Sequence, residues 1–262
     1  MNLPIYQVDA FSEKIFGGNP AAVCPLDSWL PDELMQKIAL ENNLSETAFF
    51  VAQGEDFHIR WFTPTVEVAL CGHATLASAH VLFNHLNYTR DEILFDSKSG
   101  ILRVSKTGEG KISLDFPRNN AAAVPEAPEN ILKGLHLEKA EVFRGRDDFM
   151  VVLDSQQQIE ALNPDFALLK QSPARGIVVT AAGIDSDFVS RCFYPQSGVN
   201  EDPVTGSAHT MSAPFWAEKL GKNELTAYQL SERKGYMECR VTADRVIMTG
   251  SAITFMKGEI IL

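Results

Sequence analysis

Two stretches of the chain predict helices with almost no charged side chains. Residues 68–89 contain no Asp, Glu, Lys or Arg, with a helix expected at 73–86, and a second helix is expected at 207–220. A helix that is apolar all round must be covered all round, and each half of the chain offers at least five short apolar or alternating segments typical of strands. We therefore predict an α+β fold of two similar domains, each a mixed, curved, barrel-like β-sheet wrapped around one central helix.

An internal repeat supports this division. Arg60–Pro64 and Arg191–Pro195 share the pattern Arg-x-Phe-x-Pro, and each precedes a glycine, Gly72 or Gly206, that opens one of the two helices. A repeat of this length indicates two similar halves, because solenoid repeats run about 20–50 residues. We expect a pseudo-twofold relation, with both helix starts facing one cleft. Unpaired N–H groups at a helix start favour anions, which would suit a small carboxylate substrate.

Residues 117–128 are the best candidate for a linker, because they are rich in Pro, Ala and Asn and poor in large apolar groups. This boundary predicts a first domain at 1–117 and a second at 118–249. We expect a last strand, within 250–262, to return to the first domain.

Composition and charge narrow the class of function. The net charge of −11 argues against nucleic-acid binding, which needs a basic face. Residues 68–89 are long enough for a membrane span, but their His, Asn, Ser and Thr favour a buried helix, so we expect no membrane partner. No signal-peptide pattern opens the chain. Cys24, Cys71, Cys192 and Cys239 are scattered, so we expect free thiols and a cytoplasmic location.

Two polar residues of the first half stand out by their surroundings. Glu46 precedes an apolar strand, where partial desolvation would favour the protonated carboxyl and suit it to general acid/base work. A solvated Glu at a strand end is the plain alternative. His73 lies one residue into the first helix, where it could hydrogen-bond a substrate or shuttle a proton, or only cap or pack the helix.

Asp202 and Ser207 are the corresponding candidates of the second half. Asp202 could cap a turn, and Ser207 could occupy the first turn of a helix, without further function. The repeat, however, aligns Gly206 and Ser207 with Gly72 and His73, at equivalent helix starts. This alignment favours a functional role for the pair.

Other kinds of site receive little support from the sequence. The histidines lack HExxH or Cys-pair spacing, so we predict no metal site. Ser207 does not lie in the Gly-x-Ser-x-Gly elbow of hydrolases. No Gly-x-Gly-x-x-Gly or Walker pattern occurs, so we expect no nucleotide cofactor.

Six motifs in the right order resemble the PhzF (phenazine-biosynthesis-like) family, a branch of the diaminopimelate-epimerase fold. The resemblance covers nearly the whole chain. The motifs are Asp9–Phe11, Gly18–Val23, Leu44–Phe49, Arg60–Val68, Leu70–Thr75 and Glu201–Ala208. The family fold wraps a mixed sheet around a central helix in each domain and places the active site between the domains, in agreement with the repeat.

The resemblance also implies roles for residues. It implies that Glu46 is the general acid/base, with His73, Asp202 and Ser207 beside it. The residues expected to bind substrate are Asn19, Gly72, His73, Ala74, Gly206 and Ser207. The implied chemistry is an isomerisation, in which a proton leaves one carbon and returns to another without cofactor or metal.

A comparison with the epimerase relatives refines this expectation. Those enzymes use two opposed cysteines, one at each helix start. In this chain Cys71 stands at the first position but Pro203 at the second, and a prolyl residue cannot transfer a proton. One base would then return the proton on the same face of the substrate, which fits a double-bond or tautomeric shift.

We therefore predict a cofactor-independent isomerase that acts on a small cyclic or unsaturated carboxylate. Two alternatives stay open: a ligand-binding or interaction protein that keeps the cleft without turnover, and a racemase or epimerase that uses Cys71. Retention of all four polar residues favours the isomerase. The sequence leaves the oligomeric state open, with a homodimer as one option.

Overall fold

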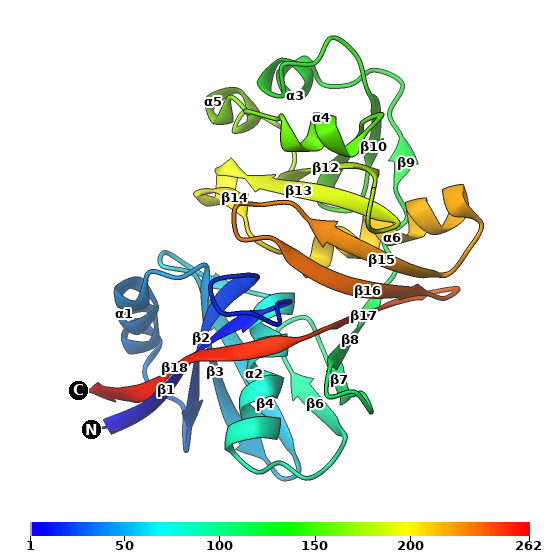
Figure 1. Cartoon of the computed structure of the whole chain (residues 1–262). Coiled ribbons are helices and arrows are strands. Elements are labelled where there is room, and N and C mark those ends of the chain that lie inside the picture. The colour runs from blue at the N-terminus through cyan, green and yellow to red at the C-terminus, as the bar shows by residue number, and fades with distance from the viewer. Residues whose placement is uncertain (1) are drawn as a thin grey trace. The chain divides into compact units, whose positions relative to one another are not determined.

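The structure is a computed structural model that describes residues 2–262. Its contacts divide the chain into unit 1, which runs up to Asp115 and includes Thr249–Leu262, and unit 2, Phe116–Met248. The sequence-based boundaries were 117/118 and 249/250. Both termini therefore belong to unit 1, and unit 2 is inserted into it (Figure 1).

Unit 1 is built on a mixed β-sheet. Its strands are β1 (Asn2–Ala10), β2 (Asn19–Leu26), β3 (Glu46–Gln53), β4 (Asp56–Phe62), β5 (Glu67–Val68), β6 (Glu92–Asp96), β7 (Leu102–Lys106), β8 (Ile112–Pro117) and β18 (Ala252–Ile261). The pairs β18–β1, β1–β2, β3–β4, β4–β5, β6–β7 and β7–β8 are antiparallel. The pairs β2–β3 and β4–β6 are parallel.

Two helices complete unit 1. α1 (Asp32–Asn42) ends at Asn43, which takes the left-handed conformation, and packs its apolar residues against β3 and β4. α2 (Gly72–His85) is the expected central helix: nine of its residues are buried, and it contacts β1, β2, β3 and β18. An uncharged helix surrounded by strands follows from its composition, because no side of it favours water.

Unit 2 is built on a second mixed sheet. Its strands are β9 (Ala122–Ala123), β10 (Glu141–Arg144), β11 (Asp148–Val152), β12 (Gly176–Ala182), β13 (Phe188–Tyr194), β14 (Val199–Asp202), β15 (Glu224–Gln229), β16 (Gly235–Val241) and β17 (Arg245–Gly250). The pairs β9–β10, β10–β11, β12–β13, β13–β14 and β15–β16 are antiparallel. The pairs β11–β12 and β13–β15 are parallel. β17 is followed in the chain by β18, a strand of unit 1.

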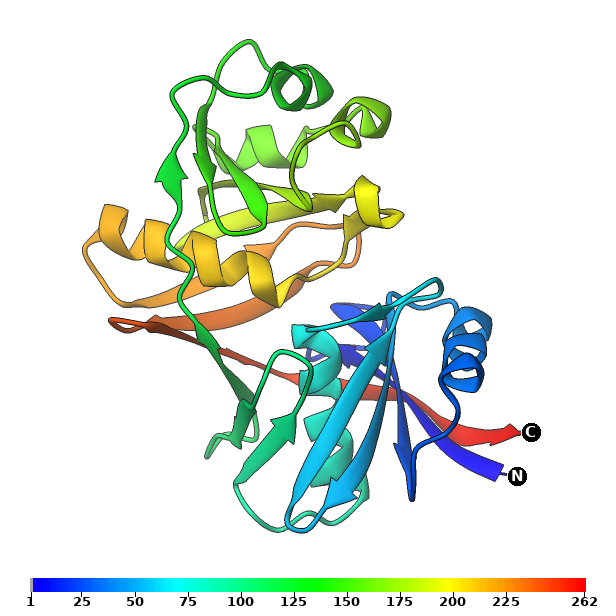
Figure 2. The ribbon, with the colours of Figure 1, turned by 180° about the vertical axis from the view of Figure 1, so that it is seen from behind.

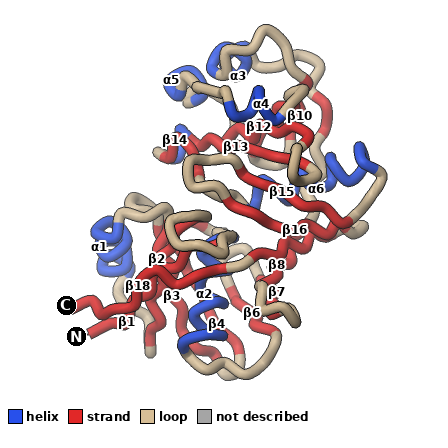
Figure 3. The backbone as a smooth tube through the Cα atoms, viewed as in Figure 1, coloured by secondary structure: helices blue, strands red, loops and turns tan. Residues whose placement is uncertain are grey.

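The helices of unit 2 are mostly short. They are α3 (Glu129–Gly134), α4 (Gln156–Glu160), α5 (Phe166–Leu169), a 3₁₀ turn (Pro195–Ser197) and α6 (Gly206–Leu220). α6 is the counterpart of α2: ten of its residues are buried, and it lies on β15 and β16 (Figure 2). The expected α+β class, with a sheet and a central helix in each half, is confirmed, and strands dominate both units (Figure 3).

The strand pairing repeats between the units in the same order. From β1 to β7 in unit 1 and from β10 to β16 in unit 2, successive neighbours are antiparallel, parallel, antiparallel, parallel and antiparallel. The short strand before each central helix, β5 or β14, pairs with the strand that carries the Arg-x-Phe-x-Pro motif. The sequence repeat therefore corresponds to a repeated topology within the chain.

The linker expected at residues 117–128 is a structured segment of unit 2. It contains β9, and beyond that strand the Val124 N–H donates to the Val142 carbonyl. Its first residues are also held, because the Arg118 N–H donates to the Asp244 carbonyl. The low hydrophobicity of residues 117–128 is therefore that of an edge strand of the sheet, and the segment is not a flexible linker between domains.

Within residues 2–262, no helix combines the length and the apolarity that a membrane crossing requires.

Candidate functional site

Glu46 occupies the first position of β3 in unit 1. It pairs in parallel register with Ala21 of β2, and its side chain is 18% exposed. The turn before it is set by Asn43, whose left-handed backbone ends α1. Asn19, the first residue of β2, is fully buried. The parallel β2–β3 pair thus brings the starts of two strands, and with them Asn19 and Glu46, to one end of the sheet.

His73, the second residue of α2, joins these side chains. Its Nε2 lies 3.4 Å from Glu46 Oε2, and its Nδ1 lies 3.2 Å from Asn19 Nδ2 and 3.5 Å from Cys71 Sγ. In the orientation that the Asn19 amide takes, its Nδ2 donates to Nδ1, which places the ring proton on Nε2, the nitrogen that faces Glu46. Four residues from three separate elements therefore form one cluster, the Glu46 cluster.

Burial fixes the charge of the imidazole. His73 is 4% exposed, and burial lowers its pKa to about 3 because the charged ring would lose its hydration. At neutral pH His73 is thus uncharged, with its Nε2 facing the carboxyl group of Glu46. This arrangement can orient Glu46 without adding a second charge to the site.

The Glu46 cluster also contains metal-ligand types. Ligand atoms of Glu46, Cys71 and His73 lie within 4.8 Å of one another. In a tetrahedral zinc site, bonds of 2.0–2.3 Å place ligand atoms about 3.3–3.8 Å apart. Both ring nitrogens of His73 already contact protein groups, one on each side. The three residues would have to move together to hold an ion, so their present geometry fits a hydrogen-bonded cluster better.

In unit 2, Asp202 and Ser207 lie at the two ends of one loop. Asp202 is the last residue of β14, and its carboxylate accepts a hydrogen bond from the Thr205 hydroxyl. The side chain of Gln229, fully buried at the end of β15, clamps this loop: its Nε2 donates to the Asp202 carbonyl at 2.6 Å and its Oε1 accepts from the Thr205 N–H at 2.8 Å. The loop is therefore held from within the sheet.

Ser207 is the second residue of α6, as His73 is of α2. Its Oγ accepts a hydrogen bond of 3.0 Å from Arg175 Nη2, and Arg175 in turn pairs with Asp148. The sequence analysis missed Arg175 and Asp148, which lie in no motif of the repeat. The sequence marks them only weakly: Asp148 opens the apolar strand β11, and Arg175 directly precedes the apolar strand β12.

The remaining predicted residues lie at the helix starts. Gly72 and Gly206 are the first residues of α2 and α6. Ala74 is fully buried. The sequence interpretation placed Pro203 at the position equivalent to Cys71, but this was wrong: the residue that caps α6, as Cys71 caps α2, is Thr205. The second position still holds no thiol.

Each unit fixes the segment before its central helix with the same ion pair, here called the Arg–Glu clasp. Arg60 Nε and Nη2 donate to the two carboxylate oxygens of Glu67 at 2.7 and 2.9 Å. Arg191 Nε and Nη2 donate to those of Glu201, both at 2.8 Å. Each guanidinium also lies over the phenylalanine ring of its own motif, at 5.1 and 5.2 Å. The shared arginine is thus structural, and it ties β4 to β5 and β13 to β14.

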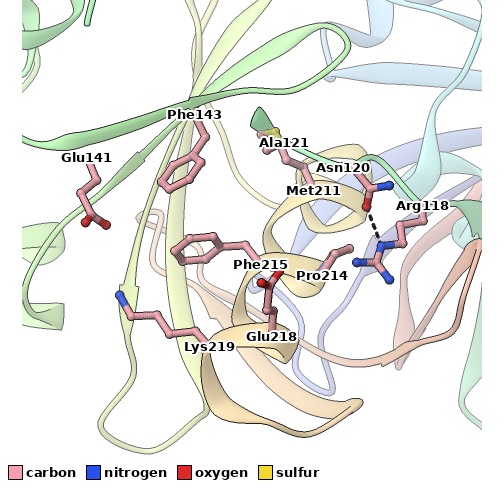
Figure 4. A pocket seen from close by; sticks show the side chains of 10 residues that line it. All are labelled: Arg118, Asn120, Ala121, Glu141, Phe143, Met211, Pro214, Phe215, Glu218 and Lys219. Atoms are coloured by element: carbon pink, nitrogen blue, oxygen red, sulfur yellow. Dashed lines mark hydrogen bonds between the residues drawn. The ribbon is translucent and has the colours of Figure 1, made fainter. Parts of the chain in front are cut away.

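A separate hollow of about 580 Å³ lies in unit 2. Its wall includes the T-shaped ring pair Phe143 and Phe215, 5.0 Å apart, and at its edge Arg118 Nε donates to Asn120 Oδ1 (Figure 4). None of the predicted site residues lines it.

The family model described as phenazine biosynthesis-like protein, PhzC–PhzF, matches residues 8–258 of the chain. An uncharacterized isomerase of Pseudomonas aeruginosa is 52% identical, with 99% of each chain covered. A solved PhzF family protein of Enterococcus faecalis has a TM-score of 0.96 at 46% identity and full coverage of both chains.

A predicted epimerase of Pseudomonas aeruginosa, 18% identical, has a TM-score of 0.75 with 99% of each chain covered. At this identity it shows the fold alone, and it agrees with the epimerase-like architecture expected from the sequence.

Proposed function

Because the chain belongs to the phenazine biosynthesis-like (PhzC–PhzF) family, we propose that it is a cofactor-independent isomerase of a small carboxylate, with Glu46 as its single general acid/base. Relatives named as isomerases support the reaction class. The observation that carries the assignment to Glu46 is its position 3.4 Å from the neutral His73 ring.

In the proposed reaction, the Glu46 carboxylate takes a proton from one carbon of the substrate, and the electron pair of the broken C–H bond moves into the neighbouring π-system. Protonated Glu46 then returns this proton to another carbon on the same face, which forms the new C–H bond. Substrate and product are isomers, so no electrons are gained or lost.

The other polar residues have supporting roles in this proposal. His73 Nε2–H orients the Glu46 carboxylate, and Asn19 fixes the His73 ring through Nδ1. Asp202 and Ser207 are proposed to bind substrate, as the family resemblance implies. The backbone N–H groups of Gly72, Ala74 and Gly206 contribute further donors, since the first N–H groups of a helix have no intrahelical partner.

A racemase with two thiol bases finds no support in unit 2. Thr205, which caps α6, has its hydroxyl bonded to Asp202. The start of α6 therefore holds no thiol equivalent to Cys71, and burial raises the pKa of the nearby Cys192 thiol, which disfavours it as a base. A single carboxylate remains the best candidate for moving the proton.

Solvent deuterium incorporation tests the proposal. A panel of small cyclic and unsaturated carboxylates is incubated in D₂O with the full chain, and exchange is followed by NMR. Glu46→Gln keeps the shape of the side chain but cannot carry the proton, so exchange should fall by about 10²–10⁴-fold.

Cys71→Ser is the matched control and should lose far less. If Glu46→Gln still catalyses deuterium exchange and Cys71→Ser does not, the proton is moved by the thiol of Cys71 and not by the carboxylate of Glu46. Binding of a carboxylate by the wild-type chain without any exchange would identify a binding protein instead.

A further inference from the structure

Arg175 lies on the loop that leads into β12, next to the start of β11. Asp148, the first residue of β11, pairs in parallel register with Gly176, the residue after Arg175. A Cβ at Gly176 would lie 2.2 Å from the Tyr194 ring, so glycine is needed for the ring to approach. The backbone therefore brings Arg175 between the Asp148 carboxylate and the face of Tyr194.

The guanidinium is held on two sides. Nε and Nη2 donate to the two carboxylate oxygens of Asp148, which is 3% exposed. The guanidinium carbon lies 5.2 Å from the centre of the Tyr194 ring. A bidentate pair and a stacked ring leave an arginine little freedom to change its conformation, so its remaining N–H groups point in fixed directions.

These remaining donors lie beside a candidate site residue. The second hydrogen of Nη2 goes to Ser207 Oγ at 3.0 Å. Within the part of the chain that the structure describes, Nη1 has no acceptor, and the Arg175 side chain is 42% exposed. Ser207 Oγ uses a lone pair for Arg175, and its own hydrogen meets no acceptor among residues 2–262.

We infer that Arg175 is a specificity-determining residue that binds a carboxylate of the substrate through Nη1, together with the Ser207 hydroxyl. This inference rests on the proposed function, because Ser207 is assigned to the substrate there. Nη1–H and the Ser207 O–H offer two neighbouring donors, which is the number that one carboxylate accepts in a bidentate contact. Asp148 acts as a positioning residue that holds the guanidinium.

The pairing with Asp148 also limits what this site selects. Asp148 balances the charge of Arg175, so the site recognises a carboxylate by directed hydrogen bonds more than by net attraction. A planar carboxylate can accept from both donors at once with its two oxygens, whereas the corresponding carboxamide has one acceptor oxygen and loses one of these two hydrogen bonds. We therefore expect discrimination between an acid and its amide, and this discrimination depends on Arg175.

Titration calorimetry with malonate, succinate and benzoate tests the inference on the full chain. At least one of these should bind the wild-type protein, and Arg175→Gln should weaken that binding about 10- to 100-fold. Arg118→Gln, at the hollow of unit 2 that Phe143 and Phe215 line, is the matched control and should bind as the wild type does. Arg175→Lys should also bind weakly, since an ammonium is a point donor and cannot reproduce the fork.

With a turned-over substrate, Arg175→Gln should raise KM by the same factor and change kcat by less than about threefold, because only binding is lost. Asp148→Asn should raise KM as well. The double variant that combines Arg175→Gln with Asp148→Asn should have a KM little higher than that of either single variant. Thermal unfolding of each variant is recorded, and Arg175→Lys replaces Arg175→Gln if the latter does not fold.

Unchanged affinity of the arginine variants, or no binding of any of the three acids to the wild type, overturns the inference and leaves Arg175 a purely structural residue. Failure of the proposed isomerisation would give a different result. The wild type would then show no deuterium exchange, while calorimetry would still show that the arginine variants bind the acid more weakly than the wild type.

Discussion

His73 Nε2 lies 3.4 Å from Glu46 Oε2, and the two groups reach this position from a helix start and a strand start 27 residues apart in the chain. Burial keeps the ring uncharged, since it lowers the pKa of His73 to about 3. A charged imidazolium would hold Glu46 as a carboxylate, because an opposite charge nearby favours the ionised form. A neutral ring adds no such charge beside Glu46, in keeping with the proposal that this carboxyl group both takes up and returns a proton.

Buried histidines predict that the protein loses stability in mild acid. Burial lowers the pKa of His73 to about 3 and that of His209 to about 4, and burial followed by the charge of His85 lowers that of His80 to about 4. Below about pH 6.5 the unfolded chain binds protons that the folded chain does not, so the free energy of unfolding falls as pH drops from 6.5 toward 4.

His209→Asn tests this prediction. His209 Nδ1 lies 2.8 Å from the Thr205 carbonyl, a contact that the Asn amide can keep without titrating. Urea unfolding at pH 7 and pH 5 should show a stability difference smaller by about 2 kcal/mol in this variant than in the wild type. His136→Asn, at an exposed position, should not change the difference. An equal difference in all three proteins would contradict the prediction.

The Arg–Glu clasp of unit 2 predicts that Glu201→Gln markedly lowers the free energy of unfolding, although the two side chains have nearly the same size. Arg191 and Glu201 side chains are 14% and 21% exposed, so Glu201→Gln leaves a poorly solvated guanidinium without its counter-charge. We expect a loss of about 2–3 kcal/mol in the free energy of unfolding, measured in urea.

The control is Glu92→Gln. Its partner Arg103 is 54% exposed and Glu92 is 41% exposed, so its loss should be at most about 1 kcal/mol. Equal losses at the two positions would mean that the clasp is no more important than a surface ion pair.

Replacing Gly18, in the loop before Asn19, should destabilise the protein more than replacing Gly54, in the turn between β3 and β4. Gly18 has φ +63°, and a Cβ there would lie 2.1 Å from the Ala10 carbonyl oxygen, whereas Gly54, at φ +67°, has no atom near enough to meet a Cβ. Gly54→Ala should cost about 1 kcal/mol, from backbone strain alone. Gly18→Ala should cost about 2–4 kcal/mol, because strain and a backbone clash add.

Thermal or urea unfolding of the two glycine variants provides the measurement. Gly18→Ala should also reduce deuterium exchange, since Asn19 supports the His73 ring. Similar stability of the two variants would show that the loop can move away from Ala10.

The sequence predicted the parts of the fold that rest on hydrophobicity and repetition. α2 could be placed because no charge occurs along it, and the Gly72 and Gly206 positions followed from the repeat. β15 is hard to recognise from the sequence, because its inward-facing residues are Leu225, Ala227 and Gln229, of which one is small and one polar. A strand that buries a Gln to clamp a loop does not show the apolar alternation that sequence reasoning uses.

Partners in the site were harder to predict than single residues. Glu67 follows Arg60 by seven residues, but Glu201 follows Arg191 by ten, so the two clasps do not align in the repeat. Asp148 and Arg175 are 27 residues apart and meet only because β11 and β12 pair in parallel. Such contacts depend on strand register, which a single sequence does not specify.

The pairing of β1 with β18 has a consequence for synthesis of the chain on the ribosome. β1 is made before unit 2 and β18 after it, so the β1–β18 pair of unit 1 cannot form until unit 2 has been made. Unit 2 is continuous from Phe116 to Met248 and has all its strands by then. Domains usually fold from the N-terminus onward as they emerge. In this protein the inserted half can finish first, while β1 waits with an open edge of the kind that invites aggregation.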